Sequence, residues 1–98
     1  MSARYRALPF ARYRLTPLDQ LSALYDRRSG TTHLVAMPVP EMLEVMGEDV
    51  LTPEAIVSRL RGKFDLAEGE NHIASVMARL EELAVLGLVE RLPPDGAA

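Results

Sequence analysis

The sequence predicts an α+β fold, with a small N-terminal antiparallel three-stranded β-sheet followed by a bundle of three helices. Two short runs with strand-like alternation flank the turn Arg27-Arg28-Ser29-Gly30, as in a β-hairpin. From residue 39 onward, apolar residues recur every three or four positions, which is the helical period. A length of 98 residues fits one compact domain.

The three predicted strands lie within the first 36 residues. The first is expected within residues 5–15, where Tyr13 and Leu15 alternate with Arg12 and Arg14, and Thr16-Pro17 is expected to end it. The second covers residues 21–26 and the third residues 31–36, joined by a turn in which glycine can adopt positive φ. Because side chains alternate along a strand, residues 32, 34 and 36 should share one face of the third strand and residues 31, 33 and 35 the other.

Three helices are predicted after this sheet. The first should run from about Pro40 to Gly47, since residues 42, 43 and 46 form an apolar stripe. Thr52 is a good N-cap for a second helix over residues 53–64, and the following proline suits the first helical position. Asn71 can cap a third helix over residues 71–86, with Gly87 at its C-terminal cap.

Charge and composition exclude several classes of function. Residues 1–14 hold four arginines and no acid, whereas the remainder holds seven basic and fourteen acidic residues. The chain has no cysteine, which excludes disulfides and cysteine-ligated metals. It shows no apolar run typical of a signal peptide or membrane span, so we expect a cytoplasmic protein that does not contact a membrane.

No catalytic constellation is found. The two histidines, His33 and His72, have no acid or nucleophile at motif spacing, and the sequence contains no phosphate-binding loop, dinucleotide fingerprint or metal-ligand cluster. We therefore expect neither an enzyme nor a cofactor or metal site.

Three helices beside a short β segment are also typical of winged-helix DNA-binding proteins. Residues 71–86 would then form the recognition helix, but Arg79 stands there with Glu81 and Glu82, a poor match for DNA phosphates. The basic residues 1–14 favour this alternative, although nucleic acid remains an unlikely partner. A scaffold or dimerisation subunit of a larger enzyme is a third interpretation.

Several short motifs, in this order, resemble PqqD-related proteins. They are Tyr25-Asp26, Ser29-Gly30-x-Thr32-His33-Leu34, the Thr52-capped helix and Leu83-x-x-x-Gly87-Leu88-Val89. The Ser-Gly-x-Thr-His-Leu string is similar to the PqqD-like subgroup associated with an HPr-kinase-related system. The resemblance covers residues 10–92. It implies one winged-helix domain, which we assign to residues 1–92 with residues 1–9 as a candidate flexible arm. The composition of residues 93–98 is typical of a disordered tail.

The resemblance further implies a non-catalytic peptide chaperone, or recognition element, for ribosomally made and modified peptides. A precursor's leader peptide would add as a strand along residues 31–36, place side chains beside the third helix, and be presented to a modifying enzyme. Edge pairing would also permit a homodimer. The expected peptide-binding residues are Thr32, His33, Leu34, Val35, Ala36, Val76, Met77, Leu80 and Leu83. For residues 34, 35, 76, 80 and 83, a place in the core is the simpler interpretation.

Overall fold

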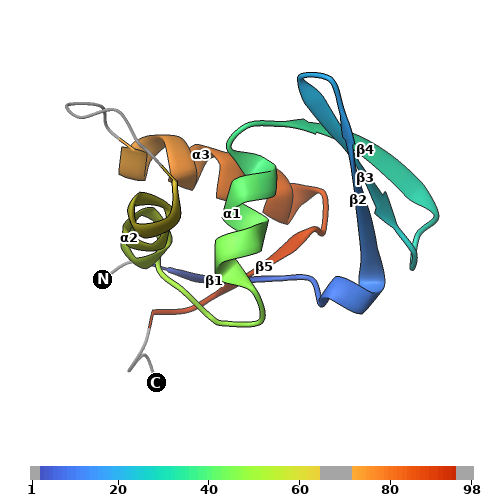
Figure 1. The fold of residues 1–98 in the computed structure, drawn as a ribbon. Helices are drawn as coiled ribbons and strands as arrows, with labels where there is room; N and C mark the ends of the chain where they lie inside the picture. The colour runs from blue at the N-terminus through green and yellow to red at the C-terminus, as the bar shows by residue number, and fades with distance from the viewer. Residues whose placement is uncertain (1–2, 65–71, 95–98) are drawn as a thin grey trace.

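Two antiparallel sheets and three helices make up the part of the chain that the computed structural model describes, residues 3–64 and 72–94 (Figure 1). In chain order the elements are β1 (Arg4–Ala7), a 3-10 helix (Phe10–Arg12), β2 (Tyr13–Leu18), β3 (Leu21–Asp26), β4 (Thr31–Ala36), α1 (Val39–Met46), α2 (Pro53–Lys63), α3 (His72–Val85) and β5 (Val89–Leu92). The predicted α+β class is confirmed. The strands are not all N-terminal, however, because β5 follows the last helix.

Strands β2, β3 and β4 form the predicted three-stranded sheet, in that order. In the β3–β4 hairpin, Asp26 lies opposite Thr31 and Leu21 opposite Ala36. Gly30 has a φ of 73° and donates its N–H to the Asp26 carbonyl over 2.8 Å. Positive φ costs glycine little because it has no Cβ, and the predicted turn is therefore confirmed.

The predicted first strand is wrong in its extent. Residues 4–7 form β1, which pairs with β5 rather than with the three-stranded sheet, and the 3-10 helix separates it from β2. Tyr5 is 1% exposed, and its backbone exchanges hydrogen bonds of 2.7 and 2.9 Å with Leu51. Residues 4–7 are therefore an ordered strand rather than a flexible arm, while residues 1–2 lie outside the described part.

Strand β2 also runs through Pro17, where the sequence predicted its end. Proline removes one backbone donor, which is tolerated on an edge strand whose outer side carries no ladder. Strand β2 occupies such an edge because it pairs with β3 alone in this sheet. The expected tail is described only as far as residue 94, so residues 95–98 remain untested.

The helices follow their predicted bounds closely, and their caps explain why. Thr52 Oγ1 accepts a 3.2 Å hydrogen bond from the Ala55 N–H, as an N-cap should. At the C-terminal end of α3, Leu88 N donates to Leu83 O over 2.9 Å and Gly87 N donates to Ala84 O over 3.0 Å. These two bonds form a Schellman motif and end α3 sharply. The predicted Asn71 cap lies outside the described residues.

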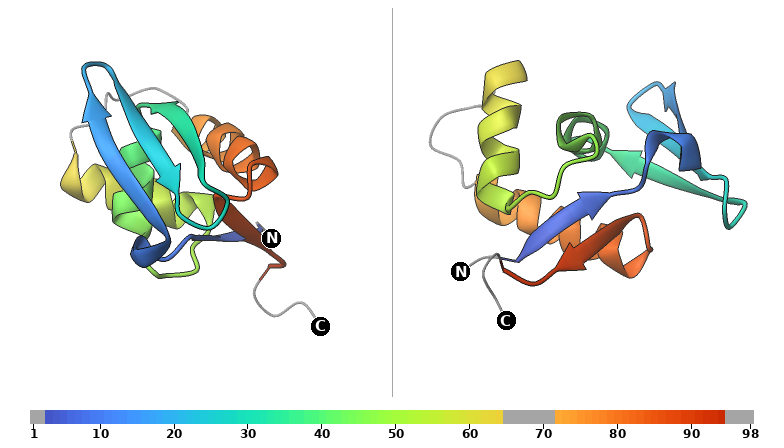
Figure 2. Two further views of the ribbon diagram at one scale, coloured as in Figure 1. Left: turned by 90° about the vertical axis from the view of Figure 1, so that its right-hand side faces the viewer. Right: turned by 90° about the horizontal axis from the view of Figure 1, so that it is seen from below.

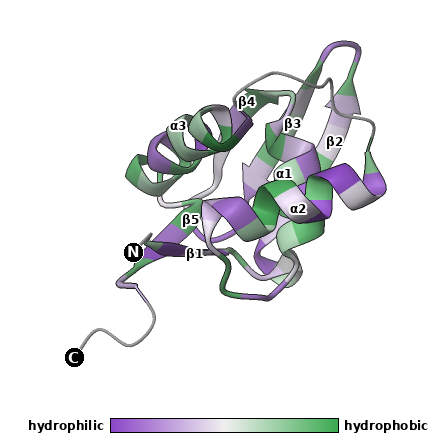
Figure 3. Cartoon of the chain, turned by 90° about the vertical axis from the view of Figure 1, so that its left-hand side faces the viewer, coloured by the Kyte–Doolittle hydropathy of each residue, from purple (hydrophilic) through white to green (hydrophobic). Residues whose placement is uncertain are grey.

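One core joins the sheets to the helices. Figure 2 shows the three-stranded sheet on one side of the molecule, with the β1–β5 pair below the helices. Hydrophobic stretches on α1 and α3 are interrupted by hydrophilic residues (Figure 3), in keeping with helices that bury one face. Fully or almost fully buried side chains include Tyr5, Leu24, Met42, Met46, Ile56, Leu80 and Leu88. No helix in residues 3–64 and 72–94 has the length and hydrophobicity needed to cross a bilayer.

Candidate functional site

Strand β4 has an unpaired edge. It pairs with β3 on one side, and no described strand pairs with its other side. The left view of Figure 2 shows α3 next to this edge. Backbone N–H and C=O groups at such an edge can pair with an added strand.

The turn before β4 is held by side-chain hydrogen bonds. Asp26 Oδ1 accepts from the Arg28 backbone N–H over 3.0 Å, and Ser29 Oγ accepts from Thr31 N over 3.2 Å. Asp26 Oδ1 also lies 3.6 Å from Arg12 Nε. The hydrogen bond from Arg28, followed by smaller contributions from Ser29 and Arg12, holds the pKa of the Asp26 carboxyl below its ordinary value despite its burial. These contacts fix where β4 begins.

Side chains alternate along β4 as predicted. Thr32, Leu34 and Ala36 are exposed, and Leu34 retains 65% of its accessible surface. On the opposite face Val35 is 7% exposed and His33 is half-buried. Val35 therefore belongs to the core, and the accessible side chains of this strand belong to the outer face.

A hollow lies between α3 and the turn that leads from β4 into α1. It is lined by Pro38, Ala74, Ser75, Ala78 and Arg79. The four helical residues follow one another at spacings that keep them on one face of α3. Three of them are alanine or serine, so this face is shallow and leaves room for another chain.

Arg79 supplies the positive charge of this hollow. Its Nη2 donates to Glu82 Oε1 over 2.9 Å. Its Nε is buried, and no acceptor among the described residues is within hydrogen-bond distance of it. A buried donor without an acceptor is costly, so the guanidinium retains capacity to bind a carbonyl or carboxylate of an added chain.

The predicted residues of α3 do not line this hollow. Val76, Leu80 and Leu83 are 2%, 0% and 3% exposed, because they form the helix face that packs into the core. Met77 is 43% exposed but lies two residues from both Ser75 and Arg79. At about 100° per residue, its side chain points to the opposite flank of the helix.

The structure thus corrects which helical residues are available. The sequence predicts that the apolar stripe of α3 contacts the peptide, yet that stripe is buried in the core. The accessible wall is the complementary face, which carries small residues and one cation. The spacing of residues 74, 75, 78 and 79 was the signal that could have identified it.

Most of the expected basic arm is engaged within the protein. Arg4 Nε donates to Pro93 O over 3.0 Å, Arg6 pairs with Glu90, and Arg12 lies beside Asp26. Charges that are already paired are less available to nucleic-acid phosphates. This arrangement counts against the DNA-binding alternative, which depends on the basic arm.

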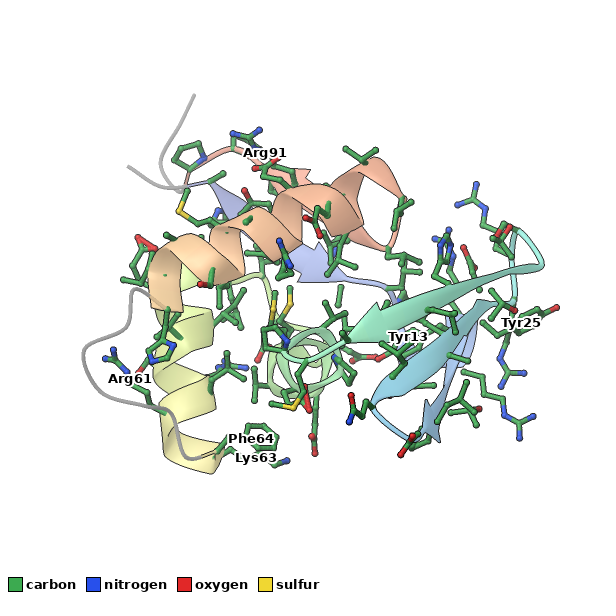
Figure 4. The ribbon with its side chains drawn as sticks, turned by 90° about the horizontal axis from the view of Figure 1, so that it is seen from above. Tyr13, Tyr25, Arg61, Lys63, Phe64 and Arg91 are labelled. Carbon is green, nitrogen blue, oxygen red and sulfur yellow. The ribbon has the colours of Figure 1, made fainter. Side chains whose placement is uncertain are left out.

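The outer face of the three-stranded sheet carries several exposed apolar side chains, and no described element covers it. Figure 4 shows Tyr25 on the side of the sheet away from the helices and Tyr13 on the side facing α1. Tyr25 shares the outer face with exposed Leu18, Leu21 and Leu34. The alternation of apolar residues identifies this face, but it identifies no ligand.

Within residues 3–64 and 72–94, no group of three histidine or acidic residues is arranged to hold a metal ion. The candidate site consists of a strand edge, a shallow helix face and one arginine. Comparison with family models, with curated proteins and with solved structures finds no match to this chain.

Proposed function

We propose that this chain is a non-catalytic, cytoplasmic peptide-binding protein of the PqqD-like type. It recognises the leader of a ribosomally made precursor peptide by β-strand addition to β4 and presents the peptide to a modifying enzyme. The observation that carries this proposal is the position of the unpaired β4 edge next to the hollow lined by Pro38 and α3. The proposal includes a winged-helix relationship between the three helices and the β1–β5 pair.

The alternation of β4 supports a specific mode of binding. An added strand would continue the pleat of β4, so its inward side chains would lie on the side of His33 and Val35 and meet α3. Its outward side chains would lie next to Leu34. Backbone pairing would supply sequence-tolerant affinity, while the α3 face would supply selectivity.

Two inward leader side chains at this hollow would give the complex moderate affinity. Burial of two apolar leader side chains stabilises the complex by about 1.5–3 kcal/mol each, and ordering of the peptide offsets part of this gain. We therefore expect affinity of about micromolar strength, which is suitable for a carrier that must release its peptide.

The direct test is an amide chemical-shift titration with synthetic peptides encoded by short reading frames beside the gene. Saturable shifts confined to residues 31–36 and 74–79 are expected. A matched peptide with alternate backbone nitrogens methylated should bind much more weakly, since methylation removes the donors needed for strand pairing.

Failure of every neighbouring peptide to shift these residues would overturn the proposal, as would equal binding of the methylated peptide. Two copies of the chain could also pair through β4. A homodimer of this kind would compete with peptide, so the apparent affinity would fall as protein concentration rises.

A further inference from the structure

A second cleft lies between the three-stranded sheet and α1. A hollow of about 350 Å³ is bordered by Tyr13, Leu15, Pro40, Glu41 and Glu44. A larger one of about 690 Å³ continues toward the turn between β2 and β3. The two share Leu15, Pro40 and Glu41, and they therefore form one cleft of the size that small ligands occupy.

The walls of this cleft are largely apolar. Tyr13 lies between the sheet and α1 in Figure 4 and is 8% exposed, and Leu15 is half-buried beside it. At the other end, Met37 is 76% exposed. An aliphatic or aromatic group could therefore bury apolar surface along the whole cleft.

The charged residues that line this cleft are all acidic. Asp19, Glu41 and Glu44 are among its lining residues, and these linings include no lysine, arginine or histidine. Glu44 Oε1 already accepts a 2.7 Å hydrogen bond from Lys63 Nζ. Glu44 is thus compensated from within the protein.

Glu41 differs from Glu44 in this respect. Its Oε1 atom is buried, and no donor in the described part of the chain is close enough to hydrogen-bond with it. A carboxylate oxygen that has lost water without gaining a donor is destabilising. A positively charged ligand would supply the missing donor in an apolar setting where ion pairing is strong.

We propose that this cleft binds an organic cation, an ammonium or guanidinium group on an aliphatic body. The cation donates to Glu41 Oε1, and the aliphatic body packs on Leu15 and Pro40. A lysine or arginine side chain has this chemistry, because its stem is apolar and its head is charged, and so does a free alkylamine. The cleft shares no lining residue with the hollow beside α3, although Val35 and Ala36 of β4 border its larger part. The inference rests on Glu41 and the α1 side of the cleft, so it does not require that β4 binds a peptide.

Hexylammonium and hexan-1-ol form a matched pair of probes, since they share an alkyl chain and differ in charge. In an amide chemical-shift titration of the native protein, hexylammonium should give saturable shifts at Leu15, Met37 and Glu41. Hexan-1-ol should bind more weakly by a factor of about ten or more, given the strength of charge-assisted hydrogen bonds. Equal binding of the two probes would overturn the proposal without any mutation.

Substitution tests the role of the carboxylate. Glu41→Gln should weaken hexylammonium binding about tenfold and leave the weak binding of hexan-1-ol unchanged. Glu48→Gln is the control, because Glu48 is exposed in the segment after α1 and does not line this cleft. Unchanged hexylammonium binding in Glu41→Gln would assign the cation to another site and overturn the proposal.

A third probe, Nα-acetyl-lysine amide, distinguishes the two sources of the cation. Binding at least as tight as that of hexylammonium would assign the cleft to a basic side chain of a protein partner. Binding of hexylammonium alone would assign it to a free amine. Either result supports a cation site at Glu41.

Discussion

Tyr5 Oη donates a 2.6 Å hydrogen bond to Glu81 Oε1 and so joins β1 to α3. The tyrosine ring is 1% exposed, and Arg91 Nη1 lies 3.6 Å from the same carboxylate oxygen. The bond connects residues far apart in sequence. It holds α3, the helix that lines the hollow, against the β1–β5 pair.

Tyr5→Phe should destabilise the protein by about 1–2 kcal/mol, because it removes a partly buried hydrogen bond to a carboxylate and keeps the ring. Unfolding in urea, followed by circular dichroism, measures the change. Tyr25→Phe is the control, since Tyr25 is 41% exposed, and its free energy of unfolding should change by less than about 0.5 kcal/mol. Equal effects of the two substitutions would show that the Tyr5 hydroxyl contributes nothing specific.

Tyr5 should also make stability depend on alkaline pH. Burial, and then the bond to Glu81, raise the pKa of Tyr5 above its ordinary 10.0. Folding thus favours the protonated hydroxyl, and this contribution is complete below pH 10.0 and is lost as pH rises through the folded-state pKa. Above pH 10.0, the free energy of unfolding should therefore fall more steeply for the native protein than for Tyr5→Phe. Parallel curves would contradict this assignment.

Asp26 should give the opposite dependence in acid. Its pKa is held below the ordinary 3.8, chiefly by the Arg28 N–H. Its stabilising contribution is therefore complete above pH 3.8 and is lost as pH falls through the folded-state pKa. The free energies of unfolding of the native protein and of Asp26→Asn should differ most near neutral pH and converge in acid. A difference that stays constant with pH would contradict this role of the carboxylate.

Substitution of Gly87 tests the C-terminal cap of α3, and Gly62 in α2 provides the comparison. Gly87 has a φ of 78°, while Gly62 lies in the last turn of α2, and a Cβ at either position would meet no atom within 4 Å. Gly87→Ala should cost about 1–2 kcal/mol from left-handed backbone strain, whereas Gly62→Ala should stabilise by about 0.5 kcal/mol. Thermal unfolding of both variants decides this, and a neutral Gly87→Ala would show that the cap tolerates a side chain.

Local signals in the sequence predicted most of the elements. The Gly30 turn, the Thr52 cap and the Gly87 cap each depend on a few adjacent residues, so their geometry can be read from a short window. The pairing of β1 with β5 could not be predicted in this way. It joins Arg4 to Leu92 in register and depends on how the whole bundle folds.

The candidate site at β4 and α3 was predicted only in part, because burial also depends on how the elements pack. Alternation predicted the strand β4 and the helical period predicted the apolar stripe of α3, but a period does not show whether a stripe is buried in the core or left accessible. Val76 and Leu80 are buried by packing against other elements, so the accessible wall is formed by Ala78 and Arg79 instead. The two flanks of α3 become distinguishable only when the surrounding elements are in place.

The flanks of α3 provide the most discriminating test of the proposed peptide function. A charge at Val35 or Leu80 would disrupt the core, because these residues are 7% and 0% exposed. Adjacent surface positions avoid this problem. Ala78 is exposed in the hollow beside β4, whereas Met77 is exposed about 100° away around the helix, outside that hollow.

Ala78→Glu and Met77→Glu introduce the same side chain at neighbouring positions, and both keep a good helix former. Ala78→Glu should weaken leader binding about tenfold or more, because the longer charged side chain fills the hollow that inward leader side chains would enter. Met77→Glu should leave affinity within about twofold of the native value, since side chains of exposed residues outside an interface contribute little to binding. Calorimetric titration with one leader peptide compares them, and equal affinities would place the peptide elsewhere even if it binds.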